Sequence, residues 1–291
     1  MLEEKKTMID YSVGNITTSD VITASGEIYL IRRLAAGTPI NLEKLMLIST
    51  QLYYNILRND AIVKRLMDLK EKDEYTYTHS INTAIYSMLI GKWLHLSKVD
   101  TNNLILSGLL HDIGKIKIPN EILNKAGKYT EDEYGMMKLH PSYGYELLKT
   151  EDSLDQNVKL AVLLHHERSD GSGYPYHFTE EKMNLYSRIV AFADVYDAMI
   201  SDRVYRKKMT PFEAFELLFN SLKDQFDSKI AHIFFKKYPA YLIGATVRLS
   251  NGEQGEIVHI PASDITSPIV MVGNKTFDFS KCQTVKITNI E

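Results

Sequence analysis

The chain has 291 residues, which is enough for one sizeable core with one or two small appendages. Hydrophobic residues make up 44% of the chain and charged residues 24%, as in ordinary globular proteins, and this excludes a chain that is disordered throughout. The formal net charge of −3 excludes a general electrostatic attraction to the DNA or RNA backbone. We therefore expect no nucleic-acid polymer as a partner, and any phosphate ligand must be held by local groups.

Cysteine usage and the apolar runs indicate the compartment. The single cysteine, Cys282, cannot form a disulfide within the chain, which is typical of a reducing environment. Residues 1–10 are charged and lack the apolar stretch of a secretory signal. No apolar run approaches the about 20 residues that a membrane-spanning helix needs. We expect a cytoplasmic protein without a membrane span.

Residues 1–70 are predicted to form an N-terminal segment that combines a short β-hairpin with a helix. The runs 21–23 and 28–31 have β-like composition and flank Gly26, which can supply a turn. Asn41 resembles the N-cap of a helix with periodic apolar residues. This segment is a candidate regulatory region.

Helical patterns dominate residues 71–238. Apolar residues recur near helical spacing over 81–96, and residues 104–110 are apolar on nearly every side, as expected of a buried helix. Two capping boxes mark further helix starts: Thr130 with Glu133, and Thr210 with Glu213. We predict an all-α bundle for this part of the chain.

Residues 239–291 change to the alternating texture of β-strands. The dipeptides Asn251-Gly252 and Gly273-Asn274 each separate two short apolar runs, and such dipeptides are strong hairpin signals. We predict a small C-terminal β-unit. The expected fold class is therefore mainly α, with a helical core, a small N-terminal β-containing segment and a small C-terminal β-unit.

Five of the nine histidines stand out because each lies on or at the end of a predicted helix: His79, His111, His140, His165 and His166. In residues 109–115 an apolar helix presents His111 and Asp112 side by side. We expect Gly114 to let the chain leave that helix, since glycine tolerates a positive φ at a C-terminal cap. A buried carboxylate there needs a cation or several hydrogen-bond donors. Taken alone, the pair is equally consistent with a core histidine beside a capping aspartate.

The other members of the set also sit at boundaries or in apolar surroundings. His165 and His166 end an apolar helix, and adjacent helical residues point about 100° apart, so both can serve one centre only where the helix frays or from different sides. His140 precedes a proline, which favours a helix boundary. Asp194 lies in a strongly apolar helix, where it must be buried and needs a partner.

Together these residues place five imidazoles and at least two carboxylates in an apolar helical core. Such ligands, without thiolates, suit Fe, Mn, Zn or Ni and exclude an iron–sulfur or all-cysteine zinc site. One metal ion cannot use them all, whereas two ions that share a bridging carboxylate can. Such metal pairs activate water and bind phosphoryl oxygens.

The core resembles the HD-GYP subgroup of the HD phosphohydrolase superfamily, over residues 75–237. Four motifs carry the resemblance: His111-Asp112-Ile113-Gly114-Lys115; Leu139-His140-Pro141-Ser142-Tyr143-Gly144; His165-His166-Glu167 with Asp170-Gly171-Ser172-Gly173-Tyr174-Pro175; and Asp194-Val195-Tyr196-Asp197-Ala198 followed by Asp202-Arg203-Val204-Tyr205-Arg206. The resemblance implies an HD-type helical bundle. It also implies a metal-dependent phosphodiesterase that hydrolyses cyclic di-GMP to linear pGpG and often onward to GMP.

The resemblance further implies how the metal ligands are shared. It assigns one ion to His79, His111, Asp112 and Asp194, with Asp112 as the bridge to a second ion held by His140, His165 and His166. The implied nucleophile is a hydroxide between the two ions, whose pKa the cations lower. Related proteins with three metals carry a glutamate one helical turn before the first histidine, and here that position is Tyr75. We therefore expect two divalent ions, Fe or Mn first and Zn or Ni as alternatives.

Four residues outside the metal set are implied to contact the substrate. Lys115 would neutralise the attacked phosphate or the leaving oxygen. Tyr174 would contact the ligand from the glycine-rich loop, and Arg203 and Arg206 would bind phosphate or a guanine edge. The alternative for the basic residues is a solvated surface, and for Tyr174 it is packing within the loop. Asp197 is expected either to cap a helix or to hold a histidine of the metal centre.

Three functions remain open from the sequence. Cyclic GMP-AMP could replace cyclic di-GMP, because the same chemistry cleaves it. A different HD phosphohydrolase, acting on a mononucleotide or an alarmone, would need only the metal ligands. A third reading is a non-catalytic receptor that binds the dinucleotide and signals to another protein. The terminal segments are candidates for homodimer contacts or for binding a signalling partner.

Overall fold

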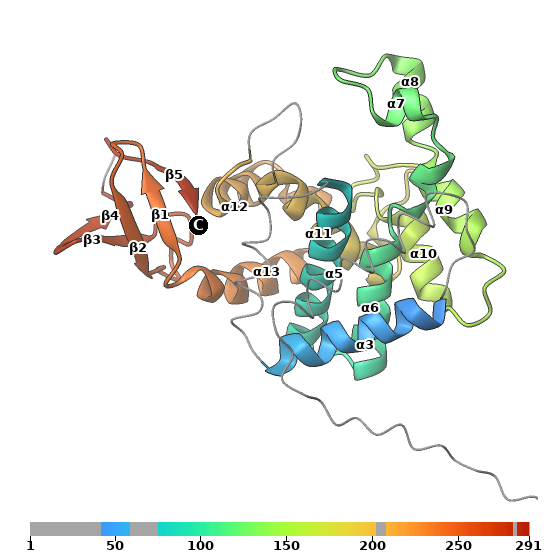
Figure 1. Ribbon diagram of the computed structural model, residues 1–291, viewed down its shortest axis with the longest axis horizontal. Helices are drawn as coiled ribbons and strands as arrows, with labels where there is room; N and C mark the ends of the chain where they lie inside the picture. The colour runs from blue at the N-terminus through green and yellow to red at the C-terminus, as the bar shows by residue number, and fades with distance from the viewer. Residues whose placement is uncertain (1–41, 59–74, 202–207, 282–283, 291) are drawn as a thin grey trace, which may run out of the picture. The chain divides into compact units, whose positions relative to one another are not determined.

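The computed structural model describes residues 42–58, 75–201, 208–281 and 284–290 (Figure 1). Residues 41–291 form one compact unit, to which everything below refers. The hairpin expected over 21–31 lies outside the described residues, as do Arg203 and Arg206. Helix α3 (Leu42–Arg58) confirms the helix expected after Asn41.

Four helices form the centre of the bundle and lie side by side in Figure 1. They are α5 (Tyr75–Trp93), α6 (Lys98–Leu110), α10 (Gln156–Leu164) and α11 (Leu185–Ile200). Residues 82–91 of α5 and residues 104–110 of α6 are all buried, so both helices are enclosed on every side. This burial explains why their sequences show little amphipathic character, and it confirms the buried helix expected over 104–110.

An aromatic core joins the central helices to α12 (Pro211–Asn220) and α13 (Ser228–Lys237). The rings of Tyr86, Tyr196 and Phe234 are at most 2% exposed, and the ring centroids of Tyr196 and Phe234 lie 4.7 Å apart. Edge-to-face contacts dominate, as the charge distribution of aromatic rings favours. This core fixes α11 against α5, and both helices carry candidate metal ligands.

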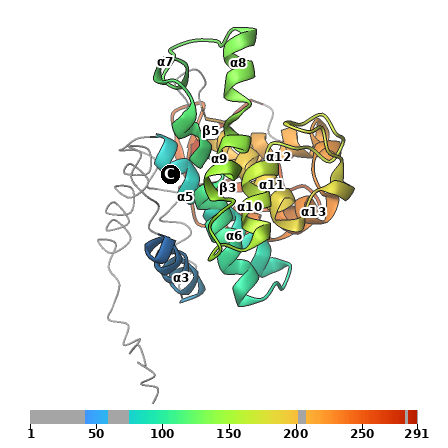
Figure 2. The same ribbon diagram turned by 90° about the vertical axis from the view of Figure 1, so that its right-hand side faces the viewer.

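Short elements and α9 follow α6 in the chain. They are η2 (Ile113–Lys117), α7 (Asn120–Leu123), α8 (Glu131–Met137) and α9 (His140–Leu148). Both views show α7 and α8 next to each other (Figure 2). The predicted capping boxes are confirmed, at Thr130 for α8 and at Thr210 for α12. Short 3₁₀ turns complete the helical part: η3 (Glu180–Lys182), η4 (Lys223–Gln225) and η5 (Tyr238–Leu242).

The C-terminal β-unit is one antiparallel sheet in the order β4-β3-β2-β1-β5. Its strands are β1 (Thr246–Leu249), β2 (Gln254–His259), β3 (Ile269–Val272), β4 (Lys275–Asp278) and β5 (Ile287–Ile290). The two predicted hairpins are confirmed, since Asn251-Gly252 joins β1 to β2 and Gly273-Asn274 joins β3 to β4. The predicted fold class, mainly α with a small C-terminal β-unit, is likewise confirmed.

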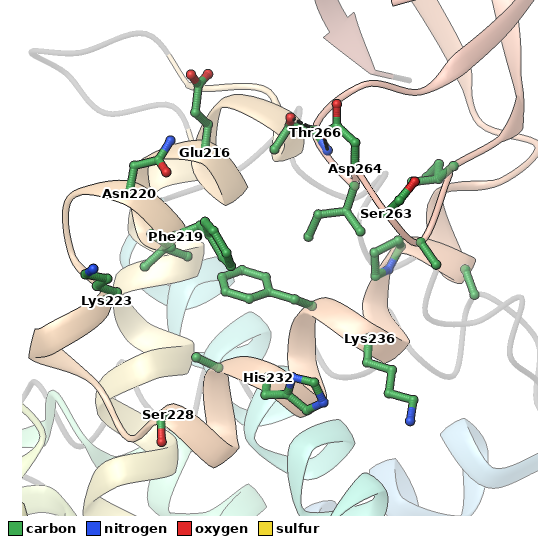
Figure 3. Close-up of a pocket in the computed structure, with 18 of the residues that line it drawn as sticks. Glu216, Phe219, Asn220, Lys223, Ser228, His232, Lys236, Ser263, Asp264 and Thr266 are labelled. Carbon is green, nitrogen blue, oxygen red and sulfur yellow. Dashed lines mark hydrogen bonds between the residues drawn. The ribbon is translucent and has the colours of Figure 1, made fainter. Parts of the chain in front are cut away.

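A pocket of about 1010 Å³ lies between α12, α13 and the loop that follows β2 (Figure 3). Phe219 lies in its centre and is 62% exposed, with Ser263, Asp264 and Thr266 on the loop side. None of the histidines or aspartates predicted as metal ligands lines it. This pocket is therefore separate from the predicted metal ligands. No helix in the described part of the chain is both long and apolar enough to cross a membrane.

Candidate metal centre

Five helices bring the predicted ligands together at their ends or on their buried faces. His79 lies on α5, His111 caps the C-terminus of α6, and His140 is the first residue of α9. Asp194 lies within α11. His165 caps the C-terminus of α10, so His166 lies outside the helix. The two side chains are therefore not forced to point about 100° apart, as adjacent residues within a helix are. The helix end thus lets two adjacent histidines face the same region.

The side chains gather in two groups, and within each group the ligand atoms lie within 4.8 Å of one another. The first group, termed here site A, is His79, His111 and Asp194. The second, site B, is Asp112, His140, His165 and His166. All are buried except His166, whose side chain is 20% exposed. The resemblance assigns these same residues to two ions, with Asp112 shared between them, and this assignment stays a prediction.

Asp112 lies between the two sites with one oxygen toward each. Its Oδ2 is 3.3 Å from His111 Nε2 and 4.0 Å from His79 Nε2 in site A. Its Oδ1 is 3.2 Å from His140 Nε2 and 4.0 Å from His165 Nε2 in site B. A carboxylate in this position can give one oxygen to each of two cations.

The ring nitrogens of the histidines are oriented by backbone carbonyls. Nδ1 of His111, His140 and His165 donates to the carbonyl of the residue three positions earlier, at 2.7, 2.8 and 2.8 Å. A carbonyl oxygen can only accept, so each Nδ1 carries a proton and Nε2 is the nitrogen that can bind a metal. Three Nε2 atoms therefore face Asp112. This is the tautomer that a metal-binding imidazole requires.

The inward-facing atoms match a cationic ligand. His140 Nε2 and His165 Nε2 lie 3.3 Å apart in site B. His111 Nε2 and Asp112 Oδ1 are buried and have no hydrogen-bond partner among the described residues. Buried polar atoms without partners are costly. A metal ion bound by these atoms would remove this cost, so the residues fit the metal that the sequence predicts, and nitrogen with carboxylate donors suits Fe, Mn, Zn or Ni.

Electrostatics keeps the ligands in the protonation states that bind metal. Burial raises the pKa of Asp112, but Lys115 and nearby histidines outweigh it and hold this pKa well below the usual range. Burial also raises the pKa of Asp194, but His79 and other nearby histidines outweigh it and hold this pKa well below the usual range. Burial and neighbouring imidazoles together hold the pKa values of His165 and His166 well below 6.5. The carboxylates are therefore ionised and these two imidazoles are neutral near pH 7.

His79 differs because it contacts two carboxylates. Its Nε2 lies 3.0 Å from Asp194 Oδ1, and its Nδ1 lies 2.7 Å from Asp197 Oδ2. Burial lowers the pKa of His79, but the hydrogen bonds to Asp194 and Asp197 outweigh it and raise this pKa to about 9. A proton between His79 and Asp194 occupies the position that a metal ion would take, so metal binding at site A must displace it below pH 9.

Two predicted substrate contacts lie beside site B. Lys115 Nζ is 2.5 Å from Asp112 Oδ2, and its side chain is 29% exposed, so it reaches both the centre and solvent. The Tyr174 ring stacks on His166 with centroids 4.6 Å apart. Burial is the main cause that raises the pKa of Tyr174, so its hydroxyl stays protonated and can donate.

Gly114 was expected to adopt a positive φ at a helix C-terminal cap, and this expectation was wrong. Gly114 lies in η2 and has no positive φ, so it does not serve as a left-handed cap. It is needed because η2 packs directly on α9, where a Cβ at this position would lie 1.9 Å from the His140 carbonyl oxygen and 2.4 Å from Gly144 N. The close approach brings Asp112 and His140 into the same site.

Asp197 contacts His79 on the Nδ1 side, away from site A, and Asn82 in turn contacts Asp197. The sequence did not point to Asn82. Asp197 is fully buried, and its Oδ1 accepts from Asn82 Nδ2 at 2.9 Å while its Oδ2 contacts His79 Nδ1. This arrangement holds the His79 ring with Nε2 facing Asp194 in site A. The available signal was the spacing, because residues three apart on a helix share a face.

We expect Asp197→Asn to weaken metal binding about 10- to 100-fold, the usual cost of removing the partner of a ligating histidine. If the new asparagine directs its oxygen toward His79, its NH₂ group faces the NH₂ group of Asn82. Both groups are donors, so the hydrogen bond to Asn82 is lost. Competition with a chelator measures the affinity. Ser201→Ala is the matched control, since Ser201 Oγ contacts the same carboxylate at 3.2 Å without touching His79. Equal metal affinity in both variants would contradict this role of Asp197.

The chain is similar in sequence to several bacterial phosphodiesterases. A cyclic di-GMP phosphodiesterase of Pseudomonas aeruginosa is 36% identical over 218 residues, or 75% of this chain and 52% of that protein. A 3′3′-cGAMP-specific phosphodiesterase of Vibrio cholerae is 35% identical over 156 residues, or 54% of this chain and 34% of that protein. The chain therefore spans about half or less of the length of these relatives.

The fold also matches a solved structure. An HDGYP protein from Bdellovibrio bacteriovorus superposes with a TM-score of 0.63 at 20% identity, over 77% of this chain and 72% of that chain. A family model for the HD domain matches residues 61–230, which is more than half of the chain. The resemblance found in the sequence is confirmed, and the chain belongs to the HD domain family.

Proposed function

We propose that the chain is a phosphodiesterase that hydrolyses cyclic di-GMP to the linear dinucleotide pGpG and, in a second cut, to GMP. The observation that carries the proposal is the position of Asp112, with one carboxylate oxygen toward each of two histidine-containing sites. Two divalent ions bound there, Fe or Mn in our proposal, would activate water and stabilise negative charge on a phosphodiester. The named relative from Pseudomonas supports the choice of substrate.

The residues around the two sites have distinct parts in the proposal. Site A and Asp112 would hold one ion, and site B would hold the second. Asp112 and Asp194 balance the charge of the ions, and their low pKa values keep them ionised. The enclosed walls of α5, α6 and α11 keep bulk water away from the ligands, which strengthens each electrostatic contact.

Lys115 is assigned to the phosphate. Its ammonium group is partly exposed and lies beside the bridging carboxylate, so it can contact a phosphodiester bound across the two sites without entering the core. Negative charge increases on the phosphoryl and leaving oxygens during cleavage, and a fixed cation stabilises that charge. Lys115 therefore acts on the transition state in this proposal.

Tyr174 and the two arginines are assigned to recognition of the nucleotide. The Tyr174 hydroxyl remains a donor, and its ring covers the exposed side of His166. Arg203 and Arg206 are assigned to phosphate or guanine because the guanidinium fork matches both. These contacts distinguish a cyclic dinucleotide from a small phosphate ester.

Cyclic GMP-AMP is the second candidate substrate, which the Vibrio relative favours. It has the same two 3′–5′ phosphodiester bonds and differs in one base, so the metal ligands do not discriminate between the two dinucleotides. A receptor without turnover is disfavoured because both sites contain complete sets of ligands.

The test is product chromatography with a panel of substrates. Protein purified without oxygen and supplied with Fe(II) or Mn(II) is given equal concentrations of cyclic di-GMP, cyclic GMP-AMP, GTP and a guanosine alarmone. We expect pGpG and GMP from cyclic di-GMP at the highest rate. Faster loss of cyclic GMP-AMP would move the assignment to the second candidate. Release of phosphate from GTP or the alarmone alone would overturn the proposal.

A further inference from the structure

Glu167 has contacts that set it apart from the metal ligands next to it. It directly follows His166 and is fully buried. Its Oε1 accepts the backbone N–H of Tyr176 at 2.7 Å, and its Oε2 accepts the backbone N–H of Phe178 at 3.0 Å. In the described part of the chain Glu167 forms no ion pair. Both oxygens are thus committed to one loop and neither is available to a metal.

A fully buried carboxylate without a cation is costly, and it persists only where its hydrogen bonds are needed. Charge-assisted bonds to backbone N–H groups are roughly twice as strong as neutral ones. Here both hydrogen bonds go to the loop over residues 168–178, at residues that follow Tyr174-Pro175 in the chain. The carboxylate therefore holds two backbone N–H groups of this loop in place.

The near side of Tyr174 is fixed by the backbone before Glu167. Tyr174 N–H donates to the His166 carbonyl at 3.1 Å. A Cβ on Gly173 would lie 2.4 Å from both Glu167 Cα and the His166 carbonyl oxygen, so the loop lies directly against residues 166–167. Tyr174 is therefore held from both sides, and its ring stays stacked on His166 of site B.

We propose that Glu167 is a positioning residue for substrate recognition, which acts by holding Tyr174 over site B. The inference rests on the proposed function, because it assumes that Tyr174 contacts a cyclic dinucleotide. Glu167 itself touches neither the substrate nor a metal. Loss of its carboxylate should therefore affect binding of the dinucleotide through Tyr174, while the metal ligands remain in place.

Glu167→Gln is the sharpest substitution, because it keeps the shape but replaces one acceptor with an NH₂ group that faces a backbone N–H. The variant loses one charge-assisted hydrogen bond and leaves one backbone N–H without an acceptor. We therefore expect KM for cyclic di-GMP to rise about tenfold or more. We expect metal content and kcat to stay near wild type, and hydrolysis of bis(p-nitrophenyl) phosphate to change little, since this small ester does not reach the loop. Glu181→Gln is the matched control, as Glu181 is exposed and its side chain has no hydrogen-bond or ion-pair partner among the described residues.

A double-mutant cycle with Tyr174→Ala separates positioning from general damage. If Glu167 acts through Tyr174, the KM of the double variant equals that of Tyr174→Ala alone. Independent, multiplying effects on KM would overturn the inference, as would loss of metal or of bis(p-nitrophenyl) phosphate hydrolysis in Glu167→Gln.

Hydrogen exchange keeps the two proposals distinguishable. The amides of Tyr176 and Phe178 should exchange faster in Glu167→Gln than in wild type, whatever the substrate is. Unchanged exchange would overturn the anchoring role itself. Wild-type protein that cleaves bis(p-nitrophenyl) phosphate but leaves cyclic di-GMP intact would instead refute the proposed function, and with it the recognition role of Glu167.

Discussion

Asp112→Ala is expected to lose metal from both sites and to abolish phosphodiester hydrolysis. Substitution of a residue that merely supports a ligand costs about 10- to 100-fold in affinity or activity, so loss of a ligand shared by two ions should exceed about 100-fold. The substitution also leaves Nε2 of His111 and His140 without the carboxylate that lies 3.3 and 3.2 Å away. Metal analysis and product chromatography on the same preparation measure both effects.

The control for Asp112→Ala must remove one carboxylate without touching the centre. Asp152 lies in a turn, is exposed, and has no hydrogen-bond or ion-pair partner among the described residues, so Asp152→Ala should match wild type in both measurements. A thermal melt of Asp112→Ala in the absence of metal establishes that the protein is folded. Folded Asp112→Ala that kept two ions per chain and cleaved cyclic di-GMP would contradict the bridging role.

Gly114→Ala is expected to lower the free energy of unfolding and, in the same variant, to weaken metal binding. The added Cβ would lie 1.9 Å from the His140 carbonyl oxygen and 2.4 Å from Gly144 N. Both are backbone atoms, which cannot rotate away as a side chain can, so η2 and α9 must separate. Overpacking typically costs about 1–3 kcal/mol and sometimes more, and backbone contacts this short predict the upper end.

Gly135→Ala provides the comparison, because a Cβ built on Gly135 meets no described atom within 4 Å apart from its chain neighbours and the backbone of its own helix. Gly135 lies inside α8, where alanine is favoured over glycine by about 1 kcal/mol. Urea unfolding of metal-free protein should therefore show Gly114→Ala destabilised and Gly135→Ala unchanged or stabilised. Metal affinity should fall only in Gly114→Ala. Similar unfolding midpoints for the two variants would contradict the packing described for η2 and α9.

The candidate ligands could be predicted from the sequence because their residue types carry the signal. Several histidines at helix ends together with carboxylates in apolar helices indicate a bound cation, and the family resemblance assigned these residues to two ions. Helix caps at Thr130 and Thr210 and the two hairpin dipeptides were equally local signals. In each case the property that decides the structure lies within a few residues.

The supporting contacts could not be predicted because they join segments far apart in the chain. Asn82 and Asp197 are 115 residues apart and meet only because α5 packs on α11. Gly114 was expected to have a positive φ, but the requirement comes from α9, which the local sequence does not reveal. Glu167 belonged to a recognised motif, yet its role depends on where the following loop folds back.

Metal titration of cyclic di-GMP hydrolysis measures whether the reaction needs two ions. Protein stripped with a chelator under anaerobic conditions receives increasing Mn(II) or Fe(II), and linear product is quantified by chromatography at each step. We expect no product without metal and a rate that saturates at about two ions per chain, the number that Asp112 and sites A and B can hold. Full hydrolysis by metal-free protein, or metal-loaded protein that leaves cyclic di-GMP intact, would contradict this expectation.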